Sequence, residues 1–273
     1  MNKKKTSPNI QERRIILILT GCINPNCNDI LTLKDAEQRL QQYIEAINWY
    51  LKNTPYYIVF CENSGTDISM YHNFKNQNRI EILTFTSSSN TIDCSKSYKE
   101  MEIIHYVYMH SKQIETGDIF VKITGRLKLL NIVEHITYFS NHIKDTSAEY
   151  ISCDMSKRHI WSDSRFFYFT QPFWGRLLSK MNLISIHYEF ERALGACIIE
   201  GRKEDLTLIY PPSLQRVSGV GGGFGCTYDL PDKEYKKKNL GKIFERFLFR
   251  IGLLPMPKKI FLKKWCNLEK HTY

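Results

Sequence analysis

The chain has 273 residues, 42% of them hydrophobic and 13% aromatic, a composition typical of a folded protein and not of a disordered one. Its 38 lysine and arginine residues outnumber its 28 aspartate and glutamate residues, giving a formal net charge of +10. This charge favours an acidic partner, such as a nucleotide, a nucleic acid or an anionic membrane surface, and no apolar run is long enough for a signal peptide or a membrane span.

We therefore expect a cytoplasmic protein, soluble or peripheral on a membrane. The eight cysteines are scattered, without a CxxC pair or a cysteine and histidine spacing typical of zinc sites. Several lie inside apolar runs, which indicates free, buried thiols in a reducing compartment.

In chain order, apolar runs alternate with segments of helical periodicity. Strands are predicted over residues 14–20, 56–61, 79–85, 118–123 and 149–153, with a further short one at 166–168; helices are predicted over 33–51, 98–111, 127–139, 174–181 and 185–197. This alternation predicts an α/β fold with a mainly parallel central sheet flanked by helices, followed by a basic C-terminal tail.

Polar or glycine-containing segments follow four of the predicted strands. They begin at Gly21, at Glu62 and Asn63, at Thr124, and at Asp154. Ligands of open parallel sheets bind at the carboxyl ends of the strands. These segments are therefore expected to outline one rim of a binding site.

The segment 117–126 is the most informative of the four. It carries Lys122 in an apolar strand and ends in Gly125 and Arg126, with a predicted helix starting at Leu127. Glycine permits close backbone approach, arginine binds phosphate oxygens with two donors, and a helix N-terminus adds free N–H groups. The segment predicts an anion site; the alternative is an ordinary turn with a surface arginine.

Three carboxylates are candidates for catalysis. Asp154 follows a strand, but the D-x-D pair that would hold a divalent cation is missing, and Asp163 is the next carboxylate along the chain. Glu189 lies on the predicted helix 185–197, where it could act as a general base or bind a sugar hydroxyl. A solvated helix face is the alternative for Glu189.

Two later segments have distinctive compositions. Residues 218–225 are glycine-dense, which predicts a mobile loop beside the active site that includes Gly219 and Gly222, or else a plain linker. From residue 236 onward, lysines and arginines interleave with phenylalanines and other apolar residues. This tail suits an anionic membrane surface or single-stranded nucleic acid; we favour the membrane, because no nucleic-acid motif accompanies the tail.

Together these motifs resemble bacterial capsule and O-antigen (lipopolysaccharide) glycosyltransferases. The likeness covers roughly residues 14–230 and rests on short segments: 122–126, 62–65, 163–165 before an aromatic run, Asp35, Arg39 and Tyr43, and the loop 219–225. It implies a Rossmann-like fold of the glycosyltransferase-A type, with a catalytic domain over residues 1–230 and a membrane-surface or partner-binding tail over 231–273. It also implies a nucleotide-sugar donor, a UDP-sugar first of all, and a lipid-linked or polysaccharide acceptor at the inner face of the cytoplasmic membrane.

The resemblance also assigns roles to individual residues. It places Gly21, Glu62 and Asn63 near the base and ribose, Lys122 and Arg126 near the diphosphate, Asp154, Asp163 and Arg165 near the donor sugar, and Glu189 near the acceptor. A divalent cation, Mg²⁺ or Mn²⁺, would bind at Asp154; cationic side chains could instead neutralise the departing diphosphate. Alternatives are a non-catalytic basic protein that binds nucleotides or nucleic acid, and another nucleotide-using α/β transferase.

Overall fold

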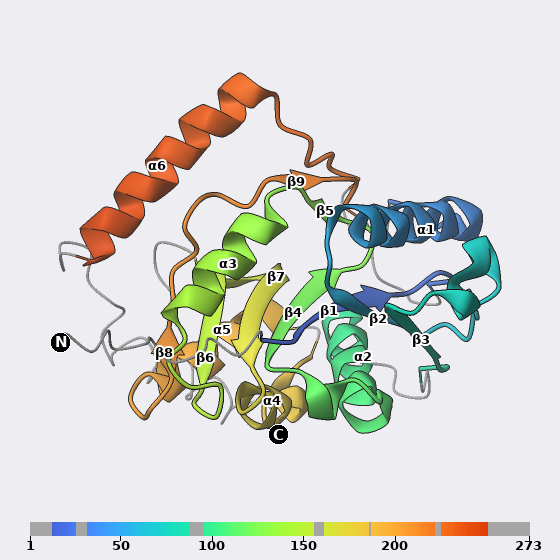
Figure 1. The fold of residues 1–273 in the computed structure, drawn as a ribbon, viewed down its shortest axis with the longest axis horizontal. Helices are drawn as coiled ribbons and strands as arrows, with labels where there is room; N and C mark the ends of the chain where they lie inside the picture. Colours follow the sequence, from blue (N-terminus) through green and yellow to red (C-terminus); the bar gives the residue numbers. More distant parts are fainter. Residues whose placement is uncertain are drawn as a thin grey trace, which may run out of the picture.

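A computed structural model describes residues 13–25, 32–87, 95–155, 161–185, 187–221 and 225–250. Its centre is a seven-stranded sheet with the strand order β3-β2-β1-β4-β7-β6-β8 (Figure 1). The strands are β1 (Ile15–Gly21), β2 (Tyr57–Glu62), β3 (Ile80–Thr84), β4 (Ile119–Thr124), β6 (Tyr150–Met155), β7 (Ser162–Thr170) and β8 (Thr207–Leu208).

The sheet is mainly parallel, as predicted. Strands β1 to β4 all pair in parallel, and β8 pairs in parallel with β6, whereas β7 runs antiparallel to both of its neighbours, β4 and β6. Because β7 is reversed, its amino end lies at the same edge of the sheet as the carboxyl ends of β4 and β6. The chain therefore brings residues from the start of β7 to the rim that the ends of the other strands form.

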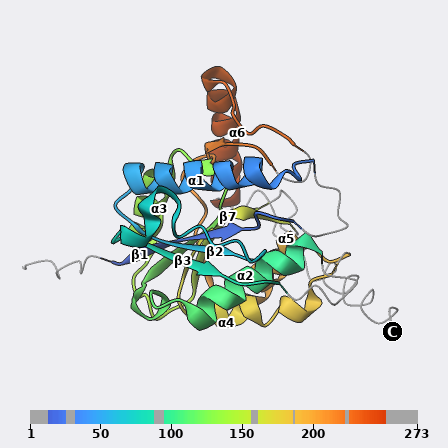
Figure 2. The same ribbon diagram turned by 90° about the vertical axis from the view of Figure 1, so that its right-hand side faces the viewer.

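Helices cover both faces of the sheet (Figure 2). One face is covered by α1 (Ala36–Asn53) and α3 (Ile132–His142), and the other by α2 (Lys96–His110), α4 (Phe173–Leu178) and α5 (Phe190–Gly201). Short 3₁₀ turns lie at η1 (Tyr71–Asn76), η2 (Ile114–Thr116) and η3 (Met181–Leu183), and β5 (Lys128–Leu129) pairs with β9 (Val217–Ser218). The helix α6 (Asp232–Arg250) lies outside the α1 and α3 layer and begins beside the predicted domain boundary at residue 230.

Side-chain caps mark the starts of α1 and α2, the two longest helices that cover the sheet. The Asp35 carboxylate accepts a hydrogen bond from the Gln38 backbone N–H at 2.7 Å, and the Ser95 hydroxyl accepts one from the Tyr98 N–H at 3.2 Å. Such caps satisfy N–H groups that have no partner within the helix. Asp35 is thus the cap of α1, one residue before the helix.

Two predicted helix starts are wrong. The backbone after Arg126 forms β5, whose Leu129 N–H donates to the Tyr50 hydroxyl at 3.0 Å, so α3 begins only at Ile132. The backbones of Ser185 and Tyr188 bond to each other in a turn, which delays α5 to Phe190. Local apolar periodicity could not reveal these pairings, because they depend on distant residues or on turn geometry.

No helix in the described segments combines the length and the apolar composition that a membrane crossing needs.

Candidate active site

A cavity of about 250 Å³ opens at the carboxyl ends of β1 and β4. These two strands are neighbours in the sheet, and the chain runs from β1 outward through β2 and β3 on one side but returns to β4 on the other. Ligands of doubly wound sheets bind at such a switch point. Residues that line the cavity are Thr20, Gly21, Cys22, Pro25, Arg39, Tyr43, Asn63, Lys96, Ser97, Lys99, Glu100, Ile103, Thr124, Arg126, Ser164, Arg165 and Glu191.

Two glycines let the backbones meet closely at this rim. The Gly125 N–H donates to the Thr20 carbonyl at 2.9 Å, and a Cβ on Gly125 would lie 2.7 Å from that oxygen. A Cβ on Gly21 would lie 2.6 Å from the Phe60 ring. Contacts this short exclude larger side chains unless the backbone or the ring moves.

Cationic side chains from four parts of the chain surround the first cavity. They are Arg39 on α1, Lys96 and Lys99 on α2, Arg126 after β4, and Arg165 on β7. Arg126 donates from Nη1 to the Gln42 Oε1 and to the Val220 carbonyl, each at 3.1 Å. A cavity with this charge suits a ligand with several anionic oxygens.

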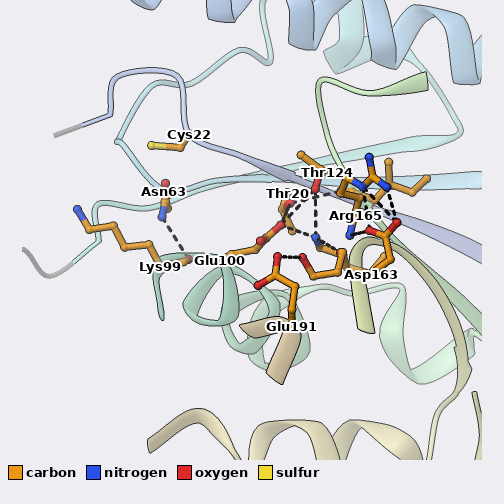
Figure 3. Close-up of polar contacts among 12 residues, drawn as sticks. Thr20, Cys22, Asn63, Lys99, Glu100, Thr124, Asp163, Arg165 and Glu191 are labelled. Carbon is orange, nitrogen blue, oxygen red and sulfur yellow. Dashed lines mark hydrogen bonds and ion pairs between the residues drawn. The ribbon is translucent and has the colours of Figure 1, made fainter. Parts of the chain in front are cut away.

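Lys122 is not part of the cavity lining, although its partners Glu100 and Thr124 are (both labelled in Figure 3). Its side chain is 1% exposed, and Nζ pairs with the Glu100 carboxylate and donates to the Ser164 carbonyl at 2.6 Å and to the Thr124 hydroxyl at 3.3 Å. Because these contacts use its three N–H bonds, Lys122 has none left to offer a diphosphate. It holds Glu100 and the start of β7 in place below the ligand space.

Glu62 also has a supporting position. Its side chain is fully buried, and its carboxylate accepts hydrogen bonds from the backbone N–H groups of Ile23, Ser64 and Thr66 at 2.8 to 3.0 Å. These bonds join the loop after β1 to the loop after β2. The neighbouring Asn63 does line the cavity and donates from Nδ2 to the Lys99 carbonyl at 3.3 Å.

A second cavity, of about 390 Å³, adjoins the first. Its lining consists of Asp154, Met155, Trp161, Asp163, Arg165, Glu191, Tyr228 and Lys242. Arg165 and Glu191 belong to both cavities, so the two spaces share a wall. Arg165 forms a bidentate salt bridge with Asp163: its Nε donates to Oδ1 at 2.9 Å, and its Nη2 donates to Oδ2 at 2.6 Å. Glu191 and Arg165 thus both line the two cavities.

The carboxylate between the cavities is Glu191, whereas the sequence singled out Glu189. Because α5 starts at Phe190, Glu189 takes the cap position, pairs with Arg192 and lines neither cavity. Glu191 accepts a hydrogen bond from the Ser164 hydroxyl at 2.8 Å. Burial raises the pKa of Glu191 above its ordinary value, which makes its carboxylate a stronger base than an ordinary one.

The glycine-dense loop contacts the site through Arg126. Gly219 has a φ of +121° and would place a Cβ 3.1 Å from the Arg126 carbonyl, so a side chain is disfavoured there on both grounds. Val220 accepts the hydrogen bond from Arg126 described above. Gly222 lies outside the residues that the structure describes.

The carboxylates do not fit a divalent cation. Asp154 lies within β6, not after it, and its Oδ1 accepts from Lys242 Nζ at 2.9 Å, while both oxygens of Asp163 are bound by Arg165. Within the described part of the chain, no group of three or more His, Cys, Asp or Glu side chains is arranged to hold a metal ion.

Several lining residues were not assigned from the sequence. Lys96, Lys99 and Glu100 lie in the first turns of α2, and a helix that follows a parallel strand begins at the binding edge of the sheet. That rule would have identified the first turns of α2. No signal in the sequence indicated that Lys242, on a helix far along the chain, would reach the second cavity.

No family model matches the sequence, and no curated protein matches it. Several solved structures share its general arrangement. They include a chain assigned as a nucleotide-diphospho-sugar transferase from Desulfovibrio desulfuricans G20 (6% identity, 72% of this chain and 80% of that one, TM-score 0.42) and a cytidylyltransferase from Leptospira borgpetersenii (12%, 74% and 77%, 0.42). A CMP:2-keto-3-deoxy-manno-octonic acid synthetase complexed with CTP is similar over 84% of this chain and 98% of that one, at 7% identity and a TM-score of 0.38. Likenesses this low carry no argument about activity.

Proposed function

We propose that the protein is a glycosyltransferase that moves a sugar from a nucleotide-sugar, a UDP-sugar first of all, to a lipid-linked or polysaccharide acceptor in surface polysaccharide (capsule or O-antigen) synthesis. One observation carries the proposal: a cation-rich cavity at the switch point of the sheet shares Arg165 and Glu191 with a second cavity. A two-substrate reaction requires two adjoining spaces with a reactive group between them.

The first cavity would take the donor. Arg126 and Arg165 are placed to neutralise the diphosphate, and Asn63 and Gly21 lie on the side of the β1 and β2 ends, where the nucleoside would fit. Asp154, Asp163 and Lys242 line the second cavity, which would take the acceptor. Cationic side chains would stabilise the leaving nucleotide without a metal.

Glu191 is the proposed general base. The acceptor hydroxyl oxygen would form a bond to the anomeric carbon while the bond from that carbon to the diphosphate oxygen breaks. The hydroxyl proton would pass to the Glu191 carboxylate, and the nucleoside diphosphate would leave with the bonding electron pair. A carboxylate with a raised pKa is a stronger base than an ordinary one, which suits this role.

Binding and donor hydrolysis test the proposal. UDP-, GDP-, CMP- and dTDP-sugars are screened by thermal shift and titration calorimetry, with free CTP and UTP alongside. We expect a UDP-sugar to bind best and Arg126→Ala to weaken its binding by about tenfold or more, since a charge-assisted contact contributes ~1.5–3 kcal/mol. Arg202→Ala, an exposed arginine away from both cavities, is the matched control.

The outcomes separate the alternatives. No binding to any nucleotide-sugar, or an unchanged affinity in Arg126→Ala, would contradict the donor assignment. Binding without donor hydrolysis or transfer to any acceptor would favour a non-catalytic nucleotide-binding protein. Tight binding of a nucleoside triphosphate, but not of a nucleotide-sugar, would favour another nucleotide-using transferase.

We further propose that transfer takes place at the inner face of the cytoplasmic membrane, where a lipid-linked acceptor would be presented to the second cavity. The net charge of +10 supports contact with an anionic surface.

A further inference from the structure

The helix α6 packs on the body of the protein through polar side chains. The Tyr235 hydroxyl donates to the Leu214 carbonyl at 2.9 Å, Asn239 accepts from the Leu214 N–H at 2.6 Å, and Lys242 pairs with Asp154. Arg246 continues this face, is half-buried, and has Nη atoms without a hydrogen-bond partner among the described residues. Positions 235, 239, 242 and 246 recur every three to four residues and so form one side of the helix.

The opposite side of α6 is apolar and exposed. Leu240 is 68% exposed, Ile243 44%, Phe244 62% and Phe247 54%. Their spacing places them on a single stripe. A surface helix ordinarily buries its apolar stripe and exposes its polar face, so α6 has the reverse arrangement. An exposed apolar patch of this kind marks an interaction surface.

Lysines extend the same stripe toward the start of the helix. Lys233, Lys236 and Lys237 are exposed and precede Leu240 at helical spacing, so they lie on the side that carries the phenylalanines. An apolar stripe bordered by lysines matches an anionic lipid surface, where the apolar groups enter the acyl boundary and the ammonium groups meet the headgroups.

We propose that this outward face of α6 binds the surface of an anionic lipid bilayer, with Leu240, Ile243, Phe244 and Phe247 inserted. Positive charge on the stripe attracts anionic headgroups, whereas it would repel the corresponding face of a parallel second copy of the chain. A bilayer therefore fits this face better than a second copy does.

Docking through α6 would also position the second cavity. Lys242, on the inward side of the same helix, lines that cavity and pairs with Asp154. Bilayer binding stands on the stripe alone, whereas the delivery of a lipid-linked acceptor to this cavity rests on the proposed function.

Vesicle co-sedimentation of the full chain tests the docking face. The probes are vesicles of phosphatidylcholine with phosphatidylglycerol, and vesicles of phosphatidylcholine alone. Phe244→Ser/Phe247→Ser should weaken binding to the anionic vesicles on the order of 100-fold, and Lys233→Glu/Lys236→Glu/Lys237→Glu by at least as much. Met109→Ser, which removes a 60% exposed apolar side chain from α2, is the matched control and should bind as the parent does.

The outcomes of this experiment either support or overturn bilayer binding by α6. Binding that is lost in both stripe variants, kept in Met109→Ser and weak on neutral vesicles supports it. No binding of the parent chain, or equal binding by Phe244→Ser/Phe247→Ser, would overturn it. A dimer in sedimentation equilibrium that these serines dissociate, without vesicle binding, would assign the face to a second copy. Nucleotide-sugar binding, measured without vesicles, should be the same in all variants, so failure of the donor assignment would be seen separately.

Discussion

Replacement of Glu100 by glutamine should destabilise the protein more than replacement of its partner Lys122 by methionine. The two side chains form an ion pair beneath the first cavity, but their surroundings differ: the Lys122 side chain is 1% exposed and that of Glu100 is 23% exposed. Glu100→Gln leaves an ammonium group sealed inside the protein. Lys122→Met leaves a carboxylate that water can reach.

The magnitudes follow from this difference. Removal of one partner from a buried pair costs ~3–5 kcal/mol when the remaining charge stays buried. We therefore expect Glu100→Gln to lower the free energy of unfolding by about 3–4 kcal/mol. Lys122→Met loses the hydrogen bond to the Ser164 carbonyl and should cost about 1–2 kcal/mol. The double variant should resemble Lys122→Met, about 3–4 kcal/mol short of the sum of the single changes.

Urea unfolding of the three variants and the parent measures these free energies of unfolding. An unchanged m-value in each variant would show that the substitution changed stability and not the surface exposed on unfolding. The pair between Lys128 and Glu45 is the control: it is 3.6 Å long with side chains 26% and 52% exposed, so Glu45→Gln should change stability by less than ~1 kcal/mol. Two results would refute the view that Lys122 is a buried charge neutralised by Glu100: equal destabilisation by the two single substitutions, or destabilisation by the double substitution that equals their sum.

Two further predictions concern the rim. The folded-state pKa of Glu191 is raised by burial, so the folded state holds the proton more tightly than the unfolded one, and stability falls as pH rises from about 4.5 through the raised pKa. Glu191→Gln should remove this fall in thermal melts across pH and abolish transfer; melts that keep the parent's pH slope would show that Glu191 is not the group responsible. Gly125→Ala should lower stability by about 2 kcal/mol or more in urea unfolding, because its Cβ would meet the Thr20 carbonyl at 2.7 Å, while Gly175→Ala, with open space at its Cβ, should be neutral or stabilising.

The general fold could be predicted because its elements repeat a local pattern. Apolar strands and amphipathic helices alternate over the first half of the chain, and each such unit adds a parallel strand. The reversal of β7 was not predictable in this way, since the apolar run 166–169 reads the same in either direction. Yet this reversal is what brings Asp163, Ser164 and Arg165 to the rim.

The site could be located from the sequence more readily than its residues could be ranked. Strand ends in the sequence indicated the edge at which the first cavity opens, because parallel strands share their carboxyl side. Whether a side chain is exposed to a ligand, in contrast, depends on which distant residues pack against it. Lys122 and Arg126 are four residues apart, and one is sealed by Glu100 and Ser164 while the other lines the cavity. Likewise, because α5 starts at Phe190, Glu191 lines the cavities and Glu189, which was expected there, does not. A motif thus indicates where charge gathers, and only tertiary contacts decide which of those charges a ligand can reach.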